Sequence, residues 1–142
     1  MAIKVIFFDL GDTLVTRKDW LPSAKETLGK LKKAGISLGV ISNTGNLIRE
    51  NLLSDYLPDD FSFDWFEESM VLLSSEVGVE KPSLGIFNMA INHANVSPWE
   101  TLFVAETIKE TFAAQQAGMQ AIRICDASVD LPKLLSLVQS ND

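Results

Sequence analysis

The stretch from residue 4 to residue 15 constrains the fold of this chain most, because it joins a buried strand to an acidic turn. Residues 5–8 are a short continuous apolar run, which is typical of a strand buried on both faces of a sheet. Asp9 follows this run directly, and residues 11–13 then turn the chain away from the strand. In open α/β sheets, ligands bind just beyond the carboxyl ends of the strands. Asp9 is therefore placed where a nucleophile or a metal ligand would lie; the alternative is an ordinary acidic turn.

The composition sets limits on the class of protein. The chain has 142 residues, of which 46% are hydrophobic and 22% charged, so we expect one globular domain over residues 1–142. Its net charge of −7 argues against nucleic acid and anionic membranes as partners. Cys125 is the only cysteine, which excludes an internal disulfide, and the first expected strand begins too early to leave room for a signal peptide. These features predict a cytoplasmic protein.

Expected strands alternate with expected helices along the sequence. The strands are expected at residues 3–9, 36–41, 69–74, 101–105 and 120–124, and the helices at residues 22–34, 46–56, 82–94, 109–117 and 131–138. Such alternation predicts an α/β fold, a three-layer Rossmann-like domain whose central parallel sheet of about five strands has helices on both faces. Residues 59–68 are aromatic and acidic and are expected to form a loop.

Four chemically functional side chains lie where strands end or a helix is about to begin: Asp9, Ser42, Lys81 and Glu106. A carboxylate can attack phosphorus and form an aspartyl-phosphate intermediate, which divides one difficult step into two. Its negative charge repels a phosphate dianion, so a lysine and a divalent cation are needed to offset that repulsion. Two carboxylates offer the hard oxygen ligands that Mg²⁺ prefers. The set therefore points to phosphoryl chemistry.

Four ordered motifs resemble those of the haloacid dehalogenase-like (HAD-like) superfamily. They are Phe8-Asp9-Leu10-Gly11-Asp12-Thr13, Ile41-Ser42-Asn43, Gly78-Val79-Glu80-Lys81-Pro82 and Phe103-Val104-Ala105-Glu106. Each motif alone is weak, but four in order at compatible spacing over nearly the whole chain is a specific pattern. The resemblance implies a Rossmann-like core, a Mg²⁺ site and, most often, phosphatase activity.

The resemblance also implies roles for individual residues. Asp9 would be the nucleophile, and Ser42 and Lys81 would be the pair that binds the phosphate. Thr13 and Asn43, which belong to the first two motifs, are the further candidates for binding the substrate.

One departure from the family pattern concerns the general acid. Phosphatases of the family usually carry a second aspartate two residues after the nucleophile, where this chain has Gly11. Asp12 is displaced by one position and is the remaining candidate for this catalytic role. Because a positioned general acid is typically worth about 10²–10⁴-fold in rate, we expect hydrolysis to be slow.

A second departure concerns the metal site. The resemblance implies that Asp9, the backbone carbonyl of Gly11 and Glu106 bind Mg²⁺, with Glu106 in place of the usual aspartate. The further acid that the family places four or five positions later falls on Glu110 or on Thr111. The longer Glu106 side chain is expected to weaken an octahedral site that has little geometric tolerance.

The spacing of the motifs leaves no room for an inserted cap domain. Asp9 and Ser42 are 33 positions apart and Ser42 and Lys81 are 39 apart, which the expected helices and strands nearly fill. An uncapped site suits either a phosphorylated small molecule or an exposed phosphate on a larger molecule. A neighbouring subunit can also serve as a lid, so a homo-oligomer is a further possibility.

The function predicted from these residues is a Mg²⁺-dependent phosphomonoester hydrolase that works through phosphorylated Asp9. The alternative is a non-catalytic HAD-like domain that retains phosphate binding or serves as an interaction module; Gly11, Ala105 and Glu106 favour it. A response-regulator receiver is disfavoured because its acceptor aspartate lies on a middle strand, and a dehalogenase because it needs an enclosed apolar pocket.

Aromatic residues near the expected site have two interpretations each. Trp20 lies in a segment that resembles a short flap, where it either covers the first helix or stacks on a substrate. The aromatic side chains of residues 61–66 are expected to be core, although an apolar patch used in self-association is the alternative.

Overall fold

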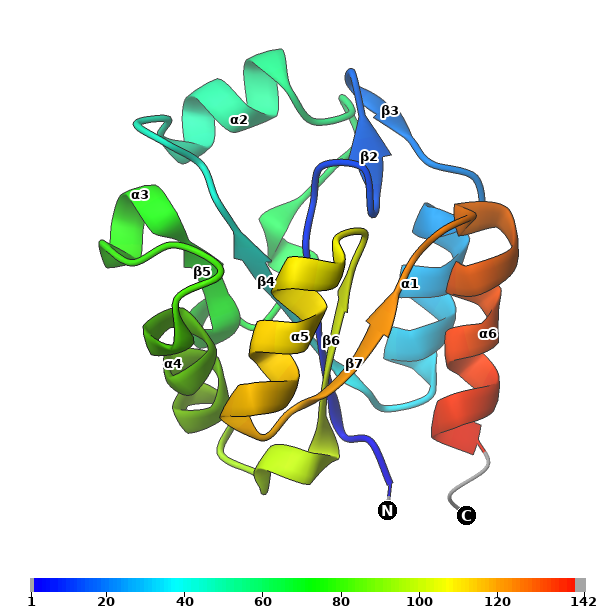
Figure 1. Cartoon of the computed structure of the whole chain (residues 1–142). Coiled ribbons are helices and arrows are strands. Elements are labelled where there is room, and N and C mark those ends of the chain that lie inside the picture. The colour runs from blue at the N-terminus through cyan, green and yellow to red at the C-terminus, as the bar shows by residue number, and fades with distance from the viewer. Residues whose placement is uncertain (1, 140–142) are drawn as a thin grey trace.

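A central parallel sheet lies between two layers of helices in the computed structural model, which describes residues 2–139 (Figure 1). Its strands are arranged in the order β5-β4-β1-β6-β7, and all neighbouring pairs are parallel. The strands are β1 (Val5–Phe8), β4 (Ser37–Ser42), β5 (Val71–Leu73), β6 (Thr101–Ala105) and β7 (Gln120–Arg123). The expected α/β architecture with a five-stranded parallel sheet is therefore confirmed.

The helices cover both faces of this sheet. They are α1 (Ala24–Lys33), α2 (Arg49–Asp55), α3 (Ser74–Val77), α4 (Leu84–Ala94), α5 (Ile108–Ala117) and α6 (Ala127–Gln139), with short 3₁₀ turns η1 (Phe63–Trp65), η2 (Glu68–Met70) and η3 (Pro98–Glu100). Helices α1 and α6 pack together on one face, and α4 and α5 pack together on the other (Figure 1). No helix within residues 2–139 is both long and apolar enough to cross a membrane.

Strand β1 is buried on both faces, as its uninterrupted apolar sequence predicts. Ile6 and Phe8 belong to the apolar cluster beneath α1 and α6, and Val5 and Phe7 belong to the cluster beneath α4 and α5. All four side chains are at most 3% exposed. Because β1 lies in the centre of the sheet, Asp9 emerges between the ends of β4 and β6.

The segment between β1 and α1 holds a small antiparallel hairpin in place of a cap. Its strands are β2 (Val15–Thr16) and β3 (Asp19–Trp20), which pair with each other outside the main sheet. No inserted cap domain occurs within residues 2–139. The indole of Trp20 stacks on Phe61 and Trp65 with ring centroids 5.5 and 5.7 Å away, and its Nε1 donates a hydrogen bond to Asp60. Trp20 is thus held by the aromatic segment that follows α2.

That aromatic segment is part of the core. Phe61, Phe63 and Phe66 are at most 9% exposed and contact the cluster beneath α1 and α6. The core interpretation is therefore confirmed. The segment was expected to be a loop with some extended structure, but it forms two short 3₁₀ turns.

The start of the last helix differs from the expected one, and local side-chain bonds mark it. Helix α6 begins four residues earlier than expected, at Ala127. The carboxylate of Asp130 accepts hydrogen bonds from the backbone N–H groups of Cys125 and Asp126, and Asp126 accepts one from Ser128. The bond from Ser128 satisfies an N–H group in the first turn of α6, and the bonds from Cys125 and Asp126 fix the backbone just before it.

Candidate active site

Three charged side chains meet at the carboxyl edge of the sheet. Lys81, in the loop between α3 and α4, places its Nζ 2.8 Å from Oδ1 of Asp9 and 2.7 Å from Oε1 of Glu110 on α5. The Lys81 side chain is 1% exposed and that of Asp9 is 13% exposed. One buried cation therefore lies between two carboxylates, which leaves the cluster with an excess of negative charge.

This environment shifts the ionisation of Asp9. Burial raises the pKa of the Asp9 carboxyl above its ordinary value, because desolvation penalises the charged form. The charge and hydrogen bond of Lys81 lower that pKa and offset part of the effect, whereas the nearby Glu110 carboxylate raises it further. An ionised Asp9 is consequently held in the fold at a cost in stability.

A neutral side chain at this position should relieve that cost. We expect Asp9→Asn to raise the free energy of unfolding of the metal-free protein at pH 7. The pKa of Asp9 is 3.8 in the unfolded state and higher in the folded state, so the unfolded state loses this proton at lower pH. The destabilisation caused by Asp9 therefore grows as the pH rises between the two pKa values and is constant above them. The gain from Asp9→Asn should therefore be smallest near pH 3.8, grow as the pH rises, and level off above the folded pKa of Asp9. Urea unfolding of both proteins in EDTA across this range measures it, and a gain independent of pH would contradict the account.

Asn43 fixes the backbone that carries Lys81. Its Oδ1 accepts a hydrogen bond from the Lys81 N–H at 2.8 Å, and its Nδ2 donates one to the Lys81 carbonyl at 3.0 Å. The following peptide bond, to Pro82, is cis. Both polar ends of the Asn43 amide are thus engaged by Lys81, which makes Asn43 a positioning residue in this structure.

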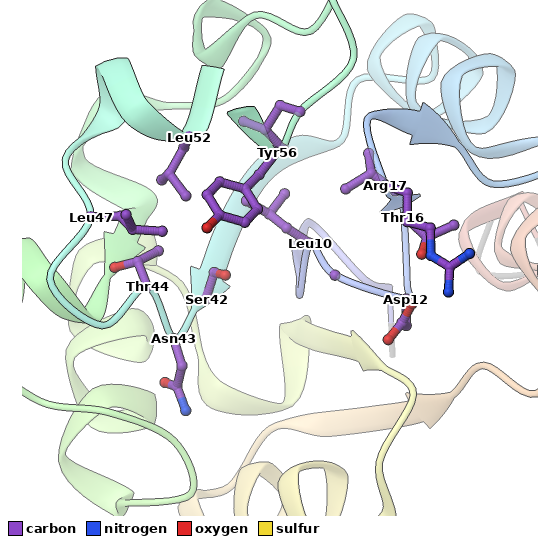
Figure 2. A pocket seen from close by; sticks show the side chains of 13 residues that line it. Leu10, Asp12, Thr16, Arg17, Ser42, Asn43, Thr44, Leu47, Leu52 and Tyr56 are labelled. Carbon is purple, nitrogen blue, oxygen red and sulfur yellow. The ribbon is translucent and has the colours of Figure 1, made fainter. Parts of the chain in front are cut away.

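The other residues of the first two motifs surround Asp9. Ser42 is the last residue of β4 and is 7% exposed. Thr13 is buried, and its hydroxyl donates a long hydrogen bond of 3.4 Å to Oδ2 of Asp9. Asp12 is exposed in the turn before β2, with a left-handed φ of 60°. Asp12 and Ser42 both line a cavity of about 370 Å³. Figure 2 shows their side chains on its wall.

The two candidates for the later metal-binding acid, Glu110 and Thr111, lie differently. Glu110 reaches Lys81, whereas Thr111 donates hydrogen bonds to the backbone carbonyls of Thr107 and Ile108. Glu110, and not Thr111, is therefore the later residue that joins the site. The backbone carbonyl of Glu106 accepts a hydrogen bond from Arg123. Within residues 2–139 no group of three or more His, Cys, Asp or Glu side chains is arranged to hold a metal ion, so the part of Glu106 in metal binding stays a prediction.

Three hydroxyl residues that sequence reasoning missed anchor the loop after Ser42. The Thr44 N–H donates to Oγ of Ser74 at 2.8 Å, and the Thr44 hydroxyl donates to Oγ of Ser75 at 2.7 Å. The Ser75 N–H in turn donates to the Thr44 hydroxyl. No motif marks these residues, because their pairing depends on how α3 meets the end of β4.

Comparison with known proteins places this chain in a family. The model of the haloacid dehalogenase-like hydrolase family matches residues 18–124. The glyceraldehyde 3-phosphate phosphatase of Pyrococcus furiosus is 36% identical over 105 residues, which are 72% of this chain and 40% of that protein. The phosphoserine phosphatase of Thermus thermophilus is 32% identical over 103 residues, 71% of this chain and 39% of that protein. The chain thus spans about 40% of the length of these curated relatives.

Solved structures show the same fold. A predicted HAD-like family hydrolase from Porphyromonas gingivalis superposes with a TM-score of 0.78 at 17% identity, over 98% of this chain and 99% of that one. A HAD family enzyme from Bacteroides thetaiotaomicron, in complex with magnesium and inorganic phosphate, superposes with a TM-score of 0.73 at 17% identity, over 94% and 99% of the two chains. Because the family model covers well over half of the sequence, this chain belongs to the haloacid dehalogenase-like hydrolase family.

Proposed function

We propose that this chain hydrolyses phosphate monoesters by passing the phosphoryl group through Asp9. The observation that carries the proposal is the placement of the Asp9 carboxylate at the carboxyl edge of the sheet, 2.8 Å from the buried ammonium of Lys81. The curated relatives include glyceraldehyde 3-phosphate and phosphoserine phosphatases, which supports a phosphorylated small molecule as the substrate. An exposed phosphate on a larger molecule is the second substrate class that an uncapped site allows.

The proposed hydrolysis consists of two displacements at phosphorus, the first by Asp9 and the second by water. Oδ1 of Asp9 is bonded to Lys81, while Oδ2 accepts a long hydrogen bond of 3.4 Å from Thr13, so we assign the attack on phosphorus to Oδ2. The ester oxygen leaves with its electron pair and takes up a proton, and a phosphoryl group remains on Asp9. Water then attacks that phosphorus, which releases phosphate and restores the carboxylate. Lys81 offsets the negative charge throughout, and the Ser42 hydroxyl is proposed to hold a phosphate oxygen.

We propose that the cluster binds a magnesium ion as well as a phosphate. Oε1 of Glu110 is buried and accepts no hydrogen bond of normal geometry, although Lys81 lies close to it. Mg²⁺ commonly binds through only one or two carboxylates and keeps several waters. We propose Asp9 and Glu110 as its ligands, with Glu106 and the Gly11 carbonyl as further ones. When bound, the ion would neutralise the excess negative charge that otherwise repels a phosphate.

Magnesium should stabilise the folded protein through these carboxylates. A site with a Kd of about 1 mM would add about 1.8 kcal/mol at about 20 mM Mg²⁺, which shifts the Tm by several degrees. Thermal melts across a MgCl₂ titration measure the shift, with NaCl of equal ionic strength as reference. Glu110→Gln should remove it and Glu106→Gln should reduce it, while Glu80→Gln, at an exposed position one residue before Lys81, should retain it. A shift that survives Glu110→Gln would contradict the assignment of that ligand.

Turnover of an aryl phosphate in Mg²⁺ and in EDTA tests the proposed function directly. We expect release of phosphate that requires Mg²⁺. Gly11 at the position of the general acid favours a second candidate, a non-catalytic domain that binds phosphate. That candidate predicts saturable binding of inorganic phosphate, followed by NMR, with no turnover above buffer.

The domain and location of the protein are also part of this proposal. We propose that residues 1–142 form one catalytic-core unit and that it acts in the cytoplasm. We also propose that a second copy of the chain could cover the open site. Light scattering would detect such self-association.

A further inference from the structure

The cavity beside the charged cluster has an apolar interior. It has a volume of about 370 Å³ and lies between the end of β1, the β2 strand, the loop after β4 and the segment around α2 (Figure 2). Its apolar lining consists of Leu10, Val15, Leu47, Leu52, Tyr56 and Leu57. A space of this size admits a small ring or a short chain, which is the lower end of the range for small-molecule sites.

This cavity opens next to the proposed nucleophile. Leu10 directly follows Asp9 and lines the cavity wall. Asn43 lines it as well and is hydrogen-bonded to the backbone of Lys81, whose Nζ contacts Asp9. An ester whose phosphorus lies at Asp9 can therefore place its organic group in this space.

The Asn43 and Thr44 side chains on the β4 side of the cavity are engaged by the protein itself, whereas Asp12, Thr16 and Arg17 line its β2 side. Both ends of the Asn43 amide bond to Lys81, and the Thr44 hydroxyl bonds to Ser75. A hydroxyl placed against the wall formed by Leu47, Leu52 and Leu57 would lose its hydrogen bonds to water and find no replacement there, which is unfavourable. An apolar leaving group has no hydrogen bonds to water to lose, and its burial is favourable in free energy.

We propose that this cavity receives the leaving group and selects monoesters whose organic part is apolar, such as an aryl or short alkyl group. This inference rests on the proposed phosphatase function and names its substrate class. It separates this chain from its curated relatives, whose names refer to the polar substrates glyceraldehyde 3-phosphate and phosphoserine.

Two isosteric substrates test the selection: 4-ethylphenyl phosphate and 4-(hydroxymethyl)phenyl phosphate, which have phenols of similar acidity. We expect the ethyl compound to be preferred by about tenfold in kcat/KM, since one hydroxyl in an apolar pocket is worth about 10–10² in discrimination. Leu47→Asn, at a half-buried position on the wall, should reduce the preference to below about threefold. The matched control Ile48→Asn changes a neighbouring exposed side chain outside the lining and should keep both rate and preference.

A binding measurement separates this inference from the proposed function. Addition of 4-ethylphenol should shift the backbone amide NMR signals of the lining residues saturably, and more strongly than 4-(hydroxymethyl)phenol does. Tyr56→Ser, at a position 53% exposed, provides a second variant should Leu47→Asn fail to fold. Ring binding in the cavity without turnover of any ester would reject the phosphatase function but keep the apolar selectivity. Turnover without the ethyl preference, or no ring binding in the cavity, overturns the inference.

Discussion

Asp9→Asn is expected to abolish phosphate-ester hydrolysis and to leave the fold intact. An amide matches the carboxylate in size and can still accept a hydrogen bond from Lys81, but it is a very poor nucleophile toward phosphorus. Loss of a nucleophile typically costs on the order of 10³-fold or more in kcat. Release of p-nitrophenol from p-nitrophenyl phosphate in Mg²⁺ measures the loss, and circular dichroism measures the fold.

The matched control is Asp19→Asn, which changes an exposed carboxylate on β3 that makes no ion pair or hydrogen bond with the described residues. It should retain the full rate. Asp9→Asn with activity within about threefold of wild type, after contaminating phosphatase has been removed, would show that Asp9 is not the nucleophile. Together with the stability gain expected for the same variant, the result would show that the buried charge is kept for chemistry at a cost in stability.

The sheet could be predicted from the sequence because its signals are local and strong. Continuous apolar runs such as residues 5–8 and 102–105 predict buried strands, and parallel pairing follows from the intervening helices. The β2–β3 hairpin could not be predicted in the same way, since each strand has only two residues. Ser74 was expected to end a strand, but it begins α3, where its hydroxyl bonds to the Thr44 backbone.

The candidate site could likewise be predicted from the sequence only in part. The closeness of Asp9 and Lys81 follows from the rule that ligand sites gather at the carboxyl ends of strands. The choice between Glu110 and Thr111 depends on where α5 begins, and Thr107 settles that by capping the helix through the Glu110 N–H. The two bonds from Asn43 to the Lys81 backbone join residues 38 positions apart, and no local pattern contains that information.

The hydrolysis of alkyl phosphates should be limited by the missing acid at position 11. Without a positioned proton donor the leaving oxygen departs largely unprotonated, so esters of acidic alcohols should react much faster than alkyl esters. The double variant Gly11→Asp with Asp12→Gly restores the order that the family usually has. We expect turnover of alkyl phosphates to rise by up to about 10²-fold, while aryl phosphates change little, because the benefit of general-acid catalysis grows with the pKa of the leaving alcohol.

The backbone is suited to this exchange. A Cβ at Gly11 would meet no atom within 4 Å, and Gly11 does not have a positive φ. Asp12 is the residue with a left-handed φ of 60°, which a glycine adopts more readily than an aspartate. The double variant should therefore fold at least as well as wild type, and Asp12→Gly alone is the control that separates loss of Asp12 from gain of an acid. If the folded double variant gains nothing on alkyl phosphates, or if wild type already cleaves them as fast as aryl ones, Asp12 or a bound water already supplies the proton.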